Sequence, residues 1–170
     1  MRVPIVRALP FVLAVALPAR PAPAQDHEGC PMHKAHAAAD GVGHRHQEAT
    51  GLPSEGIEHH FLLSAEGGAI RLEVKNARQT EERARVRAHL QEIARSFAAG
   101  DFSMPERIHD QVPPGVATMK ARRDAIHYTF TETPNGGSVA IATADPAALS
   151  AIHDFLRFQI GDHGTGDPIR

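Results

Sequence analysis

One stretch decides the fold of this chain: residues 125–160, which read AIHYTFTETPNGGSVAIATADPAALSAIHDFLRFQI. In residues 125–132, apolar Ile, Tyr and Phe alternate with polar side chains, which predicts a strand with one buried face. The turn residues PNGG at 134–137 then predict an antiparallel return through 138–143. Asp145 before a proline is typical of a helix start, and the apolar stripe that follows predicts a helix over the rest of the stretch.

The preceding segment predicts the same order of elements. FLLS at 61–64 and AIRLEV at 69–74 are expected strands around a Gly67-Gly68 turn. The residues NARQ at 76–79 resemble a capping box, so a helix is expected from there to about Ala98.

Four turn-forming residues interrupt the loop at 101–124, so only short helical turns are expected there, around 105–109 and 116–122. The predicted order is therefore ββα-loop-ββα. It favours an α+β fold, with a four-stranded, mostly antiparallel sheet and two helices packed on one face.

Residues 1–24 have the form of a signal peptide, with two early arginines, a short apolar run and an Ala-Pro-Ala cleavage site. The apolar run is shorter than the roughly 20 residues that span a bilayer. The sequence thus predicts a periplasmic or secreted protein with no membrane span after cleavage, and one domain over 57–170. Removal of three arginines with the peptide leaves 15 basic against 20 acidic side chains, a formal charge of −5, which excludes nucleic acid as an expected partner.

Residues 25–56 contain few bulky apolar side chains, so we expect a flexible arm rich in His, Cys and Met. At 27–36 it reads HEGCPMHKAH, which places the only cysteine beside a methionine and several histidines. Thiolate, thioether and imidazole groups suit soft metals, with Cu(I) favoured and zinc or silver as alternatives. The expected metal ligands of the arm are Cys30, Met32, His33, His27 and His36. His44, His46, His59 and His60 are further potential ligands, and an incidental His-rich arm is the alternative interpretation.

The four residues Cys30-Pro31-Met32-His33 resemble the signature of heavy-metal-binding modules at the ends of copper-transporting ATPases. Here Lys34 stands where those modules usually continue with proline, and Gly29 precedes the motif in place of an aromatic. The resemblance implies ligand chemistry and not a folded module.

A second candidate set, Met104, His109 and Met119, lies in the loop. A Met-His-Met set favours Cu(I) and resists oxidation, although methionines also commonly fill gaps in cores. His89, His127, His153 and His163 are each expected to be surface or hydrogen-bonded histidines. A metal-dependent enzyme would need at least three of His109, His127, His153 and His163 to converge.

IHDQVPPG at 108–115, and AIHDFLRFQIGDH at 151–163 followed by TGD, resemble a family of small, poorly characterised bacterial proteins. The resemblance covers the chain from residue 58 onward and implies no established activity. Members sometimes bear a carbamoyltransferase label, but such an enzyme needs a phosphate-cradling loop and two larger domains, and the sequence has neither.

The sequence also contains no Gly-rich phosphate loop, no Gly-x-Ser-x-Gly elbow and no His-Glu-x-x-His helix. It therefore favours a metal-binding protein over an enzyme: one that captures, buffers or delivers copper, with a metal-efflux pump or another periplasmic protein as partner. The alternative is a structural or interaction module with an incidental arm.

Overall fold

The computed structural model describes residues 31–53 and 55–170, with side chains from residue 41 onward. Its elements are α1 (Pro31–Thr50), β1 (Ile57–Ser64), β2 (Gly67–Val74), α2 (Thr80–Ala98), α3 (Ser103–His109), α4 (Val116–Ala121), a 3-10 turn at Arg123–Ala125, β3 (Ile126–Thr133), β4 (Gly136–Thr143) and α5 (Pro146–His163). The strands form one antiparallel sheet in the order β1-β2-β4-β3. The predicted α+β fold is confirmed.

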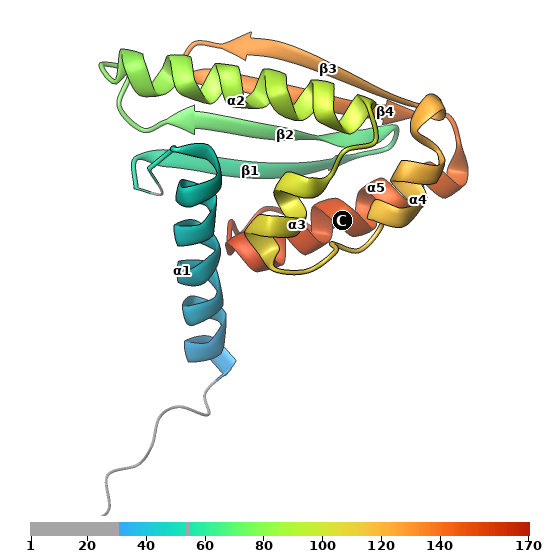
Figure 1. Cartoon of the computed structure of the whole chain (residues 1–170), viewed down its shortest axis with the longest axis horizontal. Helices are drawn as coiled ribbons and strands as arrows, with labels where there is room; N and C mark the ends of the chain where they lie inside the picture. The colour runs from blue at the N-terminus through green and yellow to red at the C-terminus, as the bar shows by residue number, and fades with distance from the viewer. Residues whose placement is uncertain (1–30, 54) are drawn as a thin grey trace, which may run out of the picture.

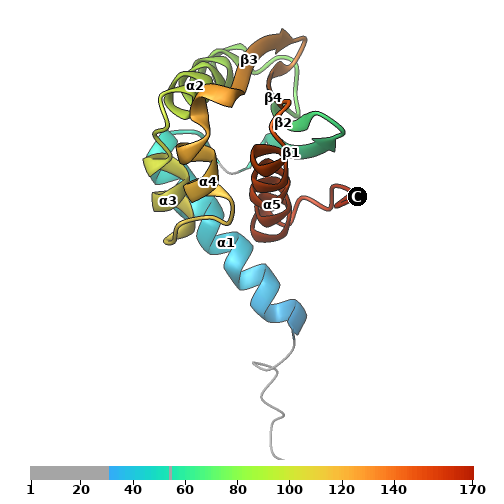
Figure 2. The same ribbon diagram turned by 90° about the vertical axis from the view of Figure 1, so that its right-hand side faces the viewer.

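Each of the two helices that follow a hairpin, α2 and α5, packs mainly on the other hairpin. Helix α2 follows β2 and contacts β3 and β4, whereas α5 follows β4 and contacts β1 and β2. Figure 1 shows α2 running along the sheet and α5 lying below β1, and Figure 2 shows the same arrangement from the side. Of the short helices, α4 packs against α5 and α3 packs against α1.

The glycines of the hairpins lie in strands, so the expected Gly67-Gly68 turn is wrong. The turn residues are Ala65 and Glu66, and the first pair of β2 is Gly67 opposite Ser64. A Cβ on Gly68 would lie 2.2 Å from the carbonyl oxygen of Leu62 and 2.4 Å from Leu156 Cδ1. Glycine is needed there because α5 and the neighbouring strand approach the backbone closely.

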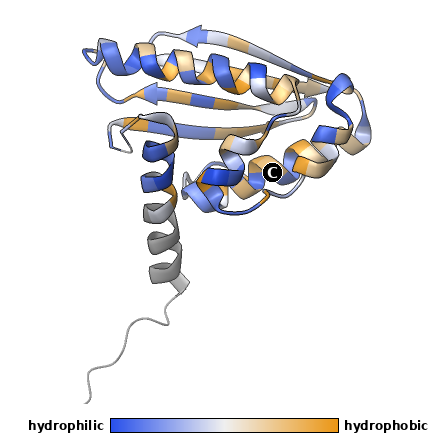
Figure 3. Cartoon of the chain, viewed as in Figure 1, coloured by the Kyte–Doolittle hydropathy of each residue, from blue (hydrophilic) through white to orange (hydrophobic). Residues whose placement is uncertain are grey.

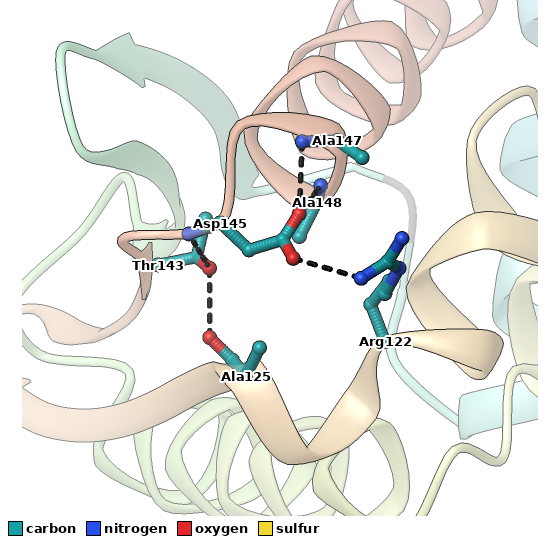
Figure 4. Close-up of polar contacts among 6 residues, drawn as sticks. All are labelled: Arg122, Ala125, Thr143, Asp145, Ala147 and Ala148. Carbon is teal, nitrogen blue, oxygen red and sulfur yellow. Dashed lines mark hydrogen bonds and ion pairs between the residues drawn. The ribbon is translucent and has the colours of Figure 1, made fainter.

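The two predicted helix starts have different outcomes. Asp145 caps α5 as expected, accepting hydrogen bonds from the backbone N–H groups of Ala147 (2.8 Å) and Ala148 (2.9 Å), as Figure 4 shows. The expected capping box at Asn76 is wrong, because α2 begins at Thr80 with no side-chain cap. Asn76 instead accepts from the backbone N–H of Arg78, which closes a local turn before the helix.

Helix α1 corrects the expectation of an arm without regular structure over residues 31–50. Only one bulky aliphatic residue, Val42, lies in its described end, and Figure 3 shows that end as mostly hydrophilic. The helix nevertheless buries Val42 and His46, and Leu52 just after it is also buried. The expectation failed for two physical reasons: the alanines of this segment favour helix, and an imidazole fills the place of an apolar contact.

The centre of the domain is packed with aliphatic and aromatic side chains. Phe97 and Phe102 stack with ring centres 4.3 Å apart, and Phe155 meets Phe97 edge-on at 5.8 Å. Met119, one of the expected metal ligands, lies fully buried in this core. The surroundings of Met119 therefore fit the alternative interpretation, in which this methionine fills a gap in the core, better than they fit a metal ligand.

Candidate metal centre

Five histidines converge where α1 meets the domain. They are His46 of α1, His59 of β1, His89 of α2, His109 of α3 and His163 of α5, called here the histidine cluster. The ring centre of His46 lies 4.9 Å from that of His59, 5.5 Å from that of His89 and 6.2 Å from that of His163. His163 in turn lies 5.5 Å from His59 and 5.1 Å from His109. Residues more than a hundred positions apart thereby form one imidazole-lined site.

Local structure explains why these side chains point inward. His59 alternates with buried Ile57 and Phe61 on the inner face of β1 and pairs with Leu72 of β2. His89 lies three residues after Val86 and four before Ile93, on the buried stripe of α2. In both places the histidine occupies a position that the periodicity of its element assigns to the core.

His163 is held in place by the tail that follows it. Asp167 accepts from the backbone N–H of Phe61 at 2.9 Å, lies 2.9 Å from His60 Nδ1, and accepts from the hydroxyl of Thr165 at 2.7 Å. These bonds fasten residues 164–167 to β1. The last residue of α5 is therefore fixed beside His59.

The histidines line a small cavity of about 40 Å³, together with Met104 and Gln159. A space of this size holds one ion or very few water molecules, because a single water needs roughly 10–15 Å³ on the same measure. It excludes an organic substrate. Apolar side chains of the core, among them Phe61, Ile93 and Phe155, form the rest of the cavity wall.

An outer hollow of about 410 Å³ adjoins the cavity. His46, His59 and His163 line both spaces, and the hollow is further lined by His60, Lys75 and Thr165 among others. The cluster thus has a wall that faces the outside. An ion has a path to the imidazoles that does not cross the aromatic core.

His109 is oriented by a carboxylate. Its Nδ1 lies 2.5 Å from Asp162 Oδ2, and its Nε2 lies 2.9 Å from the side-chain oxygen of Gln159. Since a carboxylate can only accept, Nδ1 carries a proton and donates it to Asp162. A carboxylate on the far nitrogen is the usual outer partner of a metal-bound histidine.

Burial keeps four of the imidazoles neutral. It lowers the pKa of His46 to about 3, that of His59 and of His89 to about 4, and that of His163 to about 2. Repulsion between neighbouring imidazoles lowers the pKa of each further. Neutral rings have free lone pairs at physiological pH, which metal binding requires.

Two buried nitrogens of the site have no hydrogen-bond partner in the described part of the chain: Nε2 of His59 and Nε2 of Gln159. An unpaired buried polar atom costs about 1–3 kcal/mol, so such atoms are rare and call for a ligand or a water. Turning the amide of Gln159 would present its NH₂ group to the Nε2 lone pair of His109. His59 Nε2 has no such internal remedy.

The ring spacing is close to that of a metal site. Three imidazoles bound to one tetrahedral ion have ring centres about 5 Å apart, since each nitrogen lies about 2 Å from the metal. Among residues 31–53 and 55–170, no group of three or more His, Cys, Asp or Glu side chains is placed to hold a metal ion as the side chains stand. The ring centres of His46, His59 and His163 lie 4.9, 5.5 and 6.2 Å apart.

The structure divides the expected ligand set. Met104 and His109 line the cavity, whereas Met119 does not. The backbone of Met32, His33 and His36 belongs to the first turns of α1, which projects away from the domain in Figure 1. Cys30 and His27 lie outside the described residues. Pro31 and His46 are separated by about 20 Å along the helix, so the residues of the first turn of α1 lie too far from the cluster to share one ion with it.

The histidines weighed for a metal-dependent enzyme do not converge as that hypothesis requires. His127 is exposed on β3, and His153 Nε2 lies 2.9 Å from the carbonyl oxygen of Ser64. Only His109 and His163 of that set share the cavity. From the sequence, His89 is expected to be a surface or hydrogen-bonded histidine, and His46 and His59 are expected to act as additional ligands of the arm. The spacing of His59 and His89 within their elements nevertheless places both on core faces.

Comparison with known proteins gives no relative: no family model, no curated protein and no solved structure matches this chain. Within the described residues, every helix is too short or too polar to cross a membrane. The function must therefore be argued from the site itself.

Proposed function

We propose that this chain is an exported protein that binds a soft or borderline metal ion, copper above others, and that its folded domain holds the ion in the histidine cluster. The observation that carries the proposal is the convergence of five imidazoles around a cavity of about 40 Å³, with Nε2 of His59 buried and unpaired. Export rests on the character of residues 1–24.

The chemistry of the donors favours copper. Imidazole nitrogens suit copper and zinc, and the thioether of Met104 in the cavity wall adds a ligand that zinc rarely takes. Cu(I) accepts both kinds of donor. The Cys-Pro-Met-His motif offers the same soft chemistry about 20 Å away along α1.

Two separate sites suggest a division of work. The Cys-Pro-Met-His motif would capture the ion, and the buried cluster would retain it for delivery to a metal-efflux pump or another periplasmic protein. A protein with one site for exchange and one for retention fits copper buffering better than a single exposed tract does.

The test is a Cu(I) competition titration against a coloured chelator, on the reduced chain 25–170 and three variants of it. One variant combines Cys30→Ser, Met32→Ala and His33→Ala, and a second combines His59→Gln and His163→Gln. The matched control combines His127→Gln and His153→Gln, which leaves the cluster intact. We expect two bound ions in the parent and the control, and one in each site variant.

Unfolding curves of all four proteins show whether the glutamines disturb the fold. Full Cu(I) affinity and stoichiometry in a folded His59→Gln, His163→Gln variant would overturn the core site. Weak binding in all four proteins would end the copper proposal and leave an interaction module.

A further inference from the structure

Helix α1 supplies one residue of the histidine cluster and packs against α3 and α5. Among residues 41–50, Val42 and His46 are buried, and Arg45 Nε donates to the backbone carbonyl of Ile108. Burial of a valine contributes about 1.5–3 kcal/mol, so an ion bound through His46 can add substantially to the docking of this part of the helix.

The connection to the domain contains a natural pivot. Gly51 directly follows the helix with φ 69°, and Leu52 after it is fixed in the core. Gly56, with φ 90°, precedes β1. A left-handed glycine between the helix and an anchored leucine is a position at which the helix can turn without disturbing the sheet.

Within the cluster, His46 occupies a central place. It contacts the rings of His59, His89 and His163. It also lines both the cavity and the outer hollow. Departure of α1 would open the cluster to solvent and remove the imidazole that joins its members.

We propose that α1 is the closing element of the metal site: ion binding in the cluster locks α1 against the domain through His46, and release of α1 lets the ion go. This inference rests on the proposed function. Coupling of this kind is reciprocal, so the docked helix raises ion affinity by the factor by which the ion favours docking. Because the Cys-Pro-Met-His motif is at the other end of α1, occupancy of the cluster also sets where that motif is held.

Hydrogen exchange measured by mass spectrometry tests the coupling. The background is the chain 25–170 with Cys30→Ser, Met32→Ala and His33→Ala, so that an ion at the motif cannot contribute. Exchange is compared without metal and with saturating Cu(I) under reducing conditions. Added to this background, His46→Gln is the test variant and His44→Gln is the matched control, since His44 lies on the same helix but is exposed.

In the background and the His44→Gln control, we expect Cu(I) to slow exchange at least tenfold both in residues 43–50 and around His59 and His163. In His46→Gln, Cu(I) should bind about 10–100-fold more weakly, and protection around His59 and His163 should remain while that of 43–50 disappears.

Two results would overturn the coupling and leave the proposed function standing. One is protection around His59 and His163 without any in 43–50 in the background protein, and the other is unchanged affinity in His46→Gln. Absence of both Cu(I) binding and protection in the background would overturn the coupling and the core metal site together.

Discussion

Two groups of rings fill the space between sheet and helices, and they meet at the cavity, which Phe97, Phe155 and the histidine cluster line together. Phe97, Phe102 and Phe155, called here the phenylalanine end, have ring centres 4.3–6.1 Å apart. The imidazoles of the histidine cluster, called here the histidine end, have ring centres 4.9–6.2 Å apart. The packing geometry is nearly the same.

The comparison shows how the stability of a packed core can come to depend on pH and on metal ions. Benzene rings are indifferent to protons and metal ions, so the phenylalanine end contributes the same stability at any pH. Imidazole rings pack almost as well while neutral, but each has a nitrogen that takes up a proton or an ion. The histidine end thus makes the domain depend on its surroundings.

The largest expected effect is the loss of stability in acid, to which only the histidine end contributes. His46, His59, His89 and His163 take up protons near pH 6.5 when unfolded but only near pH 2 to 4 when folded. The free energy of unfolding therefore falls as the pH drops below 6.5, by up to about 1.4 kcal/mol per histidine and pH unit. From pH 7 to pH 5 we expect the metal-free protein to lose roughly 7 kcal/mol in urea unfolding, because four histidines contribute together.

A variant with His59→Phe and His163→Phe serves as the control for that experiment, because two of the four titrating rings are then benzene rings. Its loss of stability over the same pH interval should be about half that of the parent. Equal stability of the parent at pH 7 and pH 5 would show that these imidazoles are not buried in the neutral form.

Truncation of the phenylalanine end comes next in size. Phe102→Ala should lower the free energy of unfolding by about 3–5 kcal/mol, because it leaves a new cavity where this fully buried ring, which does not line the histidine cavity, is packed. The loss should be the same at pH 7 and pH 6, and Cu(I) should not restore it selectively. A Phe102→Ala loss that changes strongly with pH would mean that the phenylalanine and histidine ends are not independent in energy.

The carboxylate behind His109 allows a finer test of the histidine end. Asp162→Asn should weaken Cu(I) binding by about 10–100-fold, since it removes the outer partner that fixes the ring and its tautomer. Stability without metal should change far less. Asp154→Asn, on the exposed side of the same helix, is the matched control and should bind Cu(I) as the parent does.

The smallest effect is expected where α5 begins, at the cap that supports both ends. Asp145→Ala removes the acceptor of the Ala147 and Ala148 N–H groups, visible in Figure 4, and should cost about 1 kcal/mol. Since α5 contributes both Phe155 and His163, hydrogen exchange should rise at both ends alike. A rise in hydrogen exchange at only one of the two ends would show that α5 does not carry the destabilisation from its N-terminus to both.

Much of the fold could be predicted because its signals are local. Alternation in β3 and β4, the Asp145-Pro146 start of α5 and the stripe of α2 are visible within a few turns of chain. The Gly67-Gly68 turn was misplaced for a reason that is not local: the glycines are required by the approach of Leu156 and of the neighbouring strand.

The sequence by itself determined the α+β order of elements, the soft-metal character of Cys30, Met32 and His33, and the unusual number of histidines. Only the tertiary structure decided which histidines meet. His46 appeared to belong to a polar arm and His163 to a polar tail, and neither pattern contains the information that α1 and the tail return to β1. The histidines come together only through long-range packing. The sequence pattern of each helix or strand indicates which of its faces is buried, but not which other element packs against that face.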